Sequence, residues 1–310
     1  MIGRKPGLCL LALPVACALG CNGGAQDVGD RPYIPPDETL ALPELIDELN
    51  ASRERIESLF LQGTTGDLRG FEANLRESRD EPARFVNGDI TAMYLAPDRL
   101  RLKADKAAVG DVLDLGSNGE RFWLHLPTEG VLYYGTYSGI DPEAARQMPV
   151  RPDLIMQVIG VAPLDRDLLQ APVPMLRYNP DADAYMLTWA ELLDGPPPRW
   201  AIQREVWYDR ETLLPTLVIL FNEDGDPALR AYLSNHASVG DSDLRIASRY
   251  DLYFPETGST MWLDFGDLNF RNPRNQRFPL PGSFNPPDPG DVPNPIPLDR
   301  ADRRRRQAGL

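Results

Sequence analysis

Few residues in this chain could carry catalytic or metal chemistry. Its 310 residues include 2 His and 3 Cys. His125 lies in an apolar run and His236 follows a predicted strand, so we interpret both as structural histidines rather than general bases. Two isolated histidines form no zinc site without cysteines or a second histidine at close spacing. The acidic turns at 181–183 and 224–226 lack the longer ligand series that a calcium loop requires.

Motifs for nucleophilic or phosphate chemistry are also missing. The short segment Gly116-Ser117-Asn118-Gly119 is neither a nucleophile elbow nor a phosphate-binding loop, and it reads as a hairpin turn. The sequence therefore predicts no catalytic residue, no cofactor-binding residue and no metal site. One alternative stays open, an envelope hydrolase, because residues far apart in sequence can form the carboxylate pair of a glycosidase.

The cysteines lie at positions 9, 17 and 21, all near the N-terminus. Arg4 and Lys5 precede an apolar run, Leu8–Leu19, which is shorter than the about 20 residues that span a bilayer and is typical of a secretory signal. The run ends Ala18-Leu19-Gly20-Cys21, which resembles the lipobox of bacterial lipoproteins. The resemblance implies cleavage before Cys21 and acylation of its thiol. A plain signal peptide with a chance cysteine is the alternative, and Cys17 is a weaker candidate.

Acyl chains on Cys21 would hold the protein at a membrane, since each buried methylene contributes about 0.8 kcal/mol. The net charge of −14 and the pI near 4.7 argue against nucleic-acid binding, which needs a basic face, and against attraction to anionic head groups. Asn22 follows the cysteine where, in the best-known sorting rule, an Asp retains a lipoprotein at the inner membrane. We therefore expect an exported protein anchored to the outer membrane and facing the periplasm.

The remaining sequence predicts a mainly β fold, a single curled antiparallel sheet wrapped as an incomplete barrel around an N-terminal helix. Leu42, Leu45, Ile46 and Leu49 recur at helical spacing, and the stripe resumes at residues 56–60, which predicts a helix from 42 to about 60 that ends at Gly63. The period then changes to two, with turn residues between short runs. A second helix is expected around 152–159. A sheet of about ten strands curls, and the first helix would cover its concave side.

We expect four segments along the chain. They are a lipoprotein signal peptide at 1–20, a flexible tether at 21–40, the half-barrel domain at 41–272, and a disordered Pro-rich tail at 273–310. Gly and Pro dominate the tether. The tail is rich in Pro, Asn and Asp, a composition that cannot bury enough apolar surface to order itself. Its arginine run at 303–306 could touch acidic lipid heads, although we favour a solvated tail.

Aromatic residues are frequent in the predicted strands. Many must fill a core, but a large curled sheet with one covering helix leaves concave surface that could line a cavity for an acyl chain. The residues that we expect at the wall of such a cavity are Phe122, Trp123, Tyr133, Trp207 and Phe221.

Two stretches resemble the LolA/LolB superfamily of outer-membrane lipoprotein carriers. The first contains Asn87-Gly88-Asp89-Ile90, Pro97, then Asn118-Gly119-Glu120-Arg121-Phe122-Trp123 and Pro127; the second runs from Val206-Trp207-Tyr208-Asp209 to Pro215 and Asp224-Gly225. The resemblance implies an unclosed antiparallel barrel with a helical lid over an apolar cavity that binds acyl chains without catalysis. The soluble carrier has an arginine before its strand-end proline, where this chain has Ala96, so the lid latch does not transfer.

Three functions follow from these observations. The first is a lipid-anchored, non-catalytic carrier or acceptor that binds acyl chains of lipids or lipoproteins. The second is an envelope sensor or scaffold on the same fold that binds a protein partner. The third is the envelope hydrolase with an unrecognised carboxylate site.

Overall fold

The computed structural model describes residues 39–64, 66, 70–146, 148–159, 163–194, 196–271, 280 and 282–301. Its helices are α1 (Leu42–Arg53), α2 (Pro142–Ala145) and α3 (Pro152–Ile159), with short 3-10 turns η2 (Pro127–Glu129) and η3 (Pro289–Asp291). Its strands are β1 (Ser58–Gly63), β2 (Gly70–Leu75), β3 (Arg84–Leu95), β4 (Arg99–Lys106), β5 (Gly110–Asn118), β6 (Arg121–Leu126), β7 (Val131–Thr136), β8 (Val173–Asn179), β9 (Ala184–Leu193), β10 (Arg199–Asp209), β11 (Pro215–Phe221), β12 (Pro227–Ser234), β13 (Ala237–Ser238), β14 (Arg245–Ile246), β15 (Arg249–Phe254), β16 (Ser259–Asp264), β17 (Asp267–Asn269) and β18 (Asn294–Pro297). The predicted signal peptide and Cys21 lie outside the described residues.

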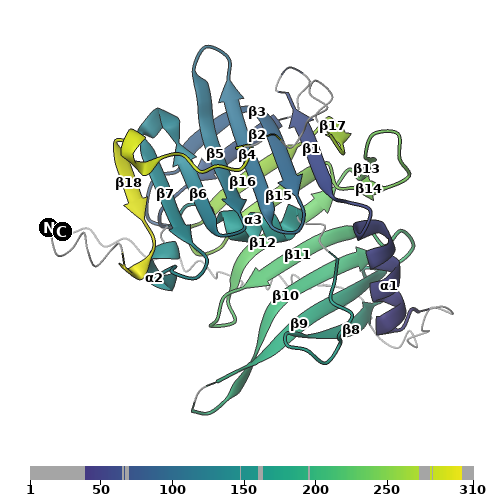
Figure 1. Cartoon of the computed structure of the whole chain (residues 1–310). Coiled ribbons are helices and arrows are strands. Elements are labelled where there is room, and N and C mark those ends of the chain that lie inside the picture. The colour runs from purple at the N-terminus through teal and green to yellow at the C-terminus, as the bar shows by residue number, and fades with distance from the viewer. Residues whose placement is uncertain are drawn as a thin grey trace, which may run out of the picture. The chain divides into compact units, whose positions relative to one another are not determined.

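One large, curled sheet contains nearly all of these strands. Its order is β18-β7-β6-β5-β4-β3-β2-β16-β15-β12-β11-β10-β9-β8, and β1 pairs with both β3 and β17. The pairings are antiparallel except that of β18 with β7. In the part of the chain that the structure describes, the end strands β18 and β8 do not pair with each other, so the sheet stays open (Figure 1). This confirms the predicted fold class.

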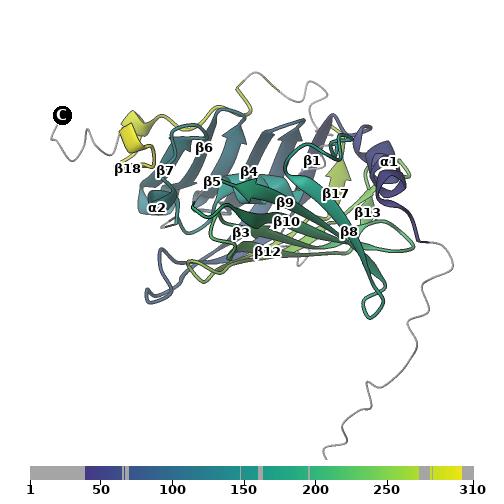
Figure 2. The ribbon, with the colours of Figure 1, turned by 90° about the horizontal axis from the view of Figure 1, so that it is seen from below.

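The sheet folds back on itself so that its apolar side chains meet. Figure 2 shows β4–β7 in one layer and β10 and β12 in the other, with α1 at one end. Alternate residues of each strand point inward, and they belong to one buried cluster that includes Leu124 of β6, Val206 of β10 and Leu252 of β15. We call this inward side the concave face and the opposite side the outer face.

Helix α1 covers part of the concave face. Pro43 lies in its first turn, and Glu44 accepts a hydrogen bond from the Ala41 amide at 2.9 Å. Leu45, Ile46 and Leu49 are buried against the sheet. The fully buried Asn50 donates to the Leu164 carbonyl at 2.9 Å and accepts from its amide at 2.7 Å, so the helix also fixes the segment after α3.

The predicted length of this helix is wrong. The helix ends at Arg53, and Leu59 and Phe60 belong to β1. A short apolar run fits both periods when a strand is buried on its two faces, and β1 is such a strand. Helix α3 confirms the second predicted helix.

The prediction of a disordered tail is wrong for residues 282–301. β18 extends the sheet beside β7, and Phe284 and Leu298 are buried. The Asn294 and Leu298 amides donate to the Gly130 and Tyr134 carbonyls, each at 2.9 Å. Pro295 and Pro297 alternate with these donors and lack an N–H, which an edge strand tolerates on its outward side. The arginine run at 303–306 lies outside the described residues.

The helices in the described ranges include none that is long and apolar enough to cross a membrane.

Candidate ligand cavity

Two adjoining cavities lie on the concave face beneath the helices. The first, about 260 Å³, is bounded by α1, the end of α3 and strands β10–β12, and its apolar walls include Leu49, Val158, Val206 and Val218. The second, about 520 Å³, lies between α3, the segment 163–172 and strands β9 and β10. Small-molecule sites commonly measure about 300–1,000 Å³, so the pair is large enough for a ligand with an apolar part.

Three polar side chains, Arg53, Gln157 and Arg204, line both cavities. Arg53 donates to the Tyr208 hydroxyl at 2.8 Å. Arg204 lies with its guanidinium carbon 3.8 Å from the centre of the Trp189 ring. Burial lowers the pKa of Arg204 to about 10, and the positive charge of Arg53 also lowers it. The group remains protonated at neutral pH because this pKa lies well above 7.

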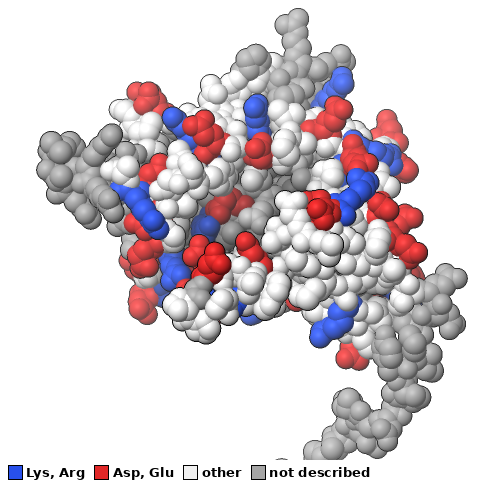
Figure 3. Space-filling view, turned by 60° about the horizontal axis from the view of Figure 1, so that its bottom comes forward, with Lys and Arg blue, Asp and Glu red and all other residues white. Residues whose placement is uncertain are grey.

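Acidic side chains outnumber basic ones in this chain, which has a net charge of −14 at pH 7. Figure 3 shows acidic and basic side chains interspersed on one face, with a hollow near its middle and a broad uncharged area beside it. Such a mixed surface agrees with the expectation that electrostatic attraction does not hold the protein at anionic lipid.

The structure places the five expected wall residues at different sites. Phe122 and Tyr133 are buried on the concave face away from both cavities. Phe122 packs against Tyr137, with ring centres 5.5 Å apart. The Tyr133 hydroxyl donates to Glu77 at 2.9 Å, and burial together with this contact raises the pKa of Tyr133. Of the five, Phe221 alone lines one of the two cavities, and its role as a ligand contact stays a prediction.

Trp123 has a structural position on the outer face instead of the expected cavity wall. Its indole N–H donates to Asp114 at 3.1 Å, and Arg101 pairs with the same carboxylate at 2.6 Å. The indole lies against Gly116, where an added Cβ would come within 2.4 Å of the ring. Arg101 also donates to the Ser283 carbonyl at 3.0 Å, so the C-terminal segment closes over this cluster.

Trp207 also lies on the outer face. Its neighbours along β10, Val206 and Tyr208, are buried in the concave core, so alternation directs Trp207 outward. Its indole N–H donates to Glu205 at 2.7 Å. The sequence motif predicted that Trp207 lies in a strand but not which face of the sheet it occupies, because a bulge between Ile202 and Arg204 shifts the register of β10.

The two histidines are placed as structural residues. His125 lies on β6 beside buried Leu124 and Leu126, and burial lowers its pKa. His236 shares a hydrogen bond of 2.9 Å with the Pro215 carbonyl, and burial lowers its pKa as well. Within the described residues, no group of His, Cys, Asp and Glu is arranged to hold a metal ion.

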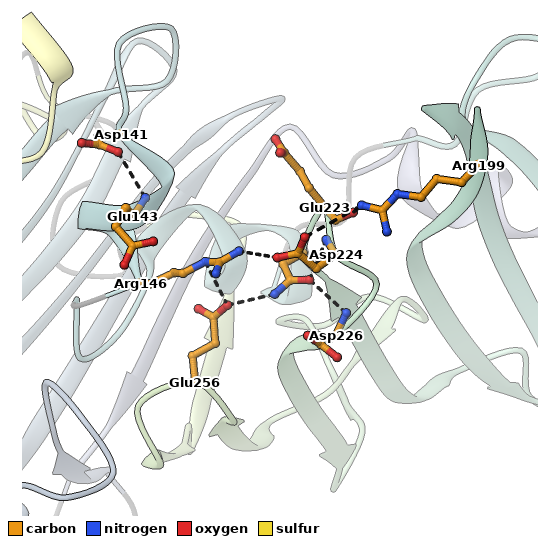
Figure 4. Close-up of polar contacts among 9 residues, drawn as sticks. Asp141, Glu143, Arg146, Arg199, Glu223, Asp224, Asp226 and Glu256 are labelled. Carbon is orange, nitrogen blue, oxygen red and sulfur yellow. Dashed lines mark hydrogen bonds and ion pairs between the residues drawn. The ribbon is translucent and has the colours of Figure 1, made fainter. Parts of the chain in front are cut away.

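One cluster of charged side chains connects the end of α2, the β11–β12 turn and the β15–β16 turn. Figure 4 shows Arg146, which follows α2, between Asp224 of the β11–β12 turn and Glu256 of the β15–β16 turn, at 2.6 and 3.8 Å. Arg199 of β10 donates to the Glu223 carbonyl at 2.7 Å. Because both carboxylates are bound by the same arginine, this cluster has the contacts of a structural clamp rather than those of an acid–base pair.

No family model and no curated protein matches the sequence. The solved structures that match include a domain from Vibrio parahaemolyticus that is described as a putative outer membrane lipoprotein-sorting protein domain. It is 13% identical in sequence, its TM-score is 0.44, and the match covers 78% of this chain and 95% of that one. A LolA superfamily protein from Nitrosomonas europaea matches at 11% identity and a TM-score of 0.45, covering 80% and 99%. A DUF1329 family protein from Desulfovibrio piger matches at 10% and 0.44, covering 78% and 94%. Likenesses this weak carry no argument about function.

Proposed function

We propose that this protein is a non-catalytic carrier or acceptor that binds the acyl chains of lipids or lipoproteins in the two cavities beneath α1 and α3. Acyl chains on Cys21 would hold it at the outer membrane, facing the periplasm. The observation that carries the proposal is the incomplete burial of the concave face. Apolar side chains of β10, β11 and α3 line space there that the helices leave unfilled.

The chemistry of such binding is passive. An acyl chain that leaves a bilayer or another carrier exchanges one apolar environment for another, so little free energy separates the two states. Transfer would then follow the relative affinities of donor and acceptor, without a covalent step. A cavity formed partly by a short helix and the segment after it can admit a chain by a small displacement of α1, which the Asn50 contacts with Leu164 hold in place.

Filling the cavity tests this proposal. Val206 lines the first cavity and points inward from β10, so Val206→Trp should occupy the space of the ligand. The measurement is the affinity for a fluorescent fatty acyl probe, with thermal unfolding of each variant recorded beside it. The matched control is Val109→Trp in the exposed turn between β4 and β5, where Val109 is 57% exposed.

We expect at least tenfold weaker binding by Val206→Trp and unchanged binding by Val109→Trp. If Val206→Trp does not fold, Leu49→Met, a nearly volume-conserving change at the same wall, should fold and alter the affinity. Wild-type protein that binds no acyl probe would contradict the proposal, as would a folded Val206→Trp variant with wild-type affinity.

One observation favours the scaffold alternative. A shallow groove of about 330 Å³ on β8–β10 is lined by Val173, Met175, Trp200 and Ile202, and Trp200 is 65% exposed. Exposed apolar patches often mark protein interaction sites. A photo-reactive residue at position 200 that cross-links to one envelope protein, in a protein that carries no lipid, would favour the scaffold over the carrier.

A further inference from the structure

Arg204 is an unusual residue for the interior of an apolar sheet. The register shift in β10 sets it opposite Trp189 on β9, and the guanidinium lies over the indole at 3.8 Å. This stacking covers the flat face of the guanidinium, whereas its N–H donors lie at the edge of the plane. Since Arg204 lines both cavities, those donors are available where the cavities meet.

No carboxylate of the described residues forms an ion pair with this guanidinium, and burial, together with the positive charge of Arg53, lowers its pKa. The acidic side chains at the walls each line a single cavity, Glu48 and Asp243 the first and Asp153, Asp165 and Asp167 the second. Asp243 pairs with Arg55 at 2.5 Å, and Asp153 pairs with Arg151 at 2.6 Å. Arg53 adds a second positive charge to the same space. Arg204 and Arg53, which also donates to the Tyr208 hydroxyl, are the charged side chains of the described residues that line both cavities.

A buried charge without a partner is costly, and stacking on an indole offsets only part of that cost. An anionic group that enters the cavity would be bound by charge-assisted hydrogen bonds, which are stronger than those between neutral groups. Apolar walls begin beside Arg204, at Val206, Val218 and Val158. The cavity therefore has a positively charged side chain, Arg204, next to apolar walls.

We propose that the cavity takes an anionic amphiphile, with its carboxylate or phosphate head group at Arg204 and Arg53 and its acyl chain against the apolar walls of β10, β11 and α3. The inference rests on the proposed acyl-binding function and names the ligand class. A site of this kind would prefer ionised fatty acids and acidic lipids to neutral acyl esters. The apolar walls alone would bind both classes equally.

The test compares two probes that differ only in charge, cis-parinaric acid and its methyl ester. Both fluoresce when they enter an apolar site, and titrations run on full-length protein at a pH at which the acid is ionised. The variants are Arg204→Gln, Arg204→Lys and a control, Arg177→Gln, on the exposed outer side of β8. Thermal unfolding confirms that each variant is folded, and inorganic phosphate serves as a competitor that has the charge but no chain.

Wild type and Arg177→Gln should bind the acid at least about tenfold more tightly than the ester, because hydrogen bonds to charged groups are strong. Arg204→Gln should abolish this preference while its affinity for the ester stays unchanged, and Arg204→Lys should keep part of it. Phosphate should displace the acid weakly.

Equal binding of acid and ester by wild type would overturn the head-group site and leave the acyl-binding function standing. A preference that persists in folded Arg204→Gln would also overturn it. If phosphate stabilises the wild type through Arg204 while the acid has no advantage over the ester, the site is one for a free anion and the proposal is wrong. If neither probe binds, the proposed function itself fails.

Discussion

At the scale of single residues, Trp123 and Arg204 show why side-chain type alone does not locate a site. Both are large, both lie on strands that are paired on their two sides, and each has a planar group in a cation–π contact with a neighbour. Trp123 is enclosed by Gly116, Asp114 and the C-terminal segment, whereas Arg204 borders open space. The first therefore contributes to stability, and the second is available to a ligand.

Replacement of Trp123 by Ala should destabilise the protein by about 3–5 kcal/mol, since it leaves a void in a closed cluster and removes the hydrogen bond from the indole to Asp114. Denaturant titration measures the loss, and acyl-probe binding per folded molecule should stay at the wild-type value. Phe221→Ala is the contrasting variant, because this side chain already borders a cavity. Phe221→Ala should lower the free energy of unfolding less than Trp123→Ala does, and it should weaken binding of the acyl probe more. A Trp123→Ala variant that is fully stable but binds poorly would return Trp123 to the ligand site.

Replacement of Arg204 by Met should have opposite effects on stability and on selectivity. Met at this position removes a partly buried charge that forms no ion pair with the described residues, so the free energy of unfolding of the ligand-free protein should rise by about 1 kcal/mol while the preference for the ionised probe is lost. Thermal and denaturant unfolding measure this change. A marked loss of stability would mean that stacking on Trp189 is the main role of Arg204.

At the scale of elements, the C-terminal segment at 282–301 is held by contacts with residues that are distant in sequence. Deletion of residues 282–310 should lower the melting temperature by more than about 4 °C, since 1 kcal/mol corresponds to about 2–4 °C in a domain of this size. The deletion removes β18, the buried Leu298 and the two hydrogen bonds from Thr136 to Asp299. Deletion of residues 302–310 alone is the control and should leave the melting temperature unchanged. Equal melting of both deletions would show that β18 adds nothing to the sheet.

Local pattern predicted most of the elements and little of the site. Alternation with turn residues between short runs predicted a curled antiparallel sheet of about ten strands, because half-buried strands have a period of two. β18 was missed because its prolines suggest disorder, and its pairing depends on an open edge at β7 that is distant in sequence. Trp207 was expected at the cavity wall because the face that it occupies depends on the bulge of β10, and a bulge has no clear signature in the sequence.

At the scale of the whole molecule, the proposed anchor at Cys21 and the folded body have separate roles. Cys21→Ala should move the protein from the membrane to the soluble fraction, because the variant lacks the thiol on which the anchoring acyl chains are expected. Fractionation of envelopes with and without high salt measures this. A variant that stays in the membrane pellet in high salt would contradict lipidation at Cys21, and acyl binding by the body should be unaffected in either case.

The most direct test of the central claim is the lipid content of the protein purified from its own envelope. Lipid extraction and mass spectrometry should find acyl lipids bound non-covalently to the wild type and to Val109→Trp, with acidic species in excess over neutral ones. Val206→Trp, which fills the first cavity, should carry several-fold less. Wild-type protein without bound acyl lipid, or a folded Val206→Trp variant with the same lipid content, would contradict the account.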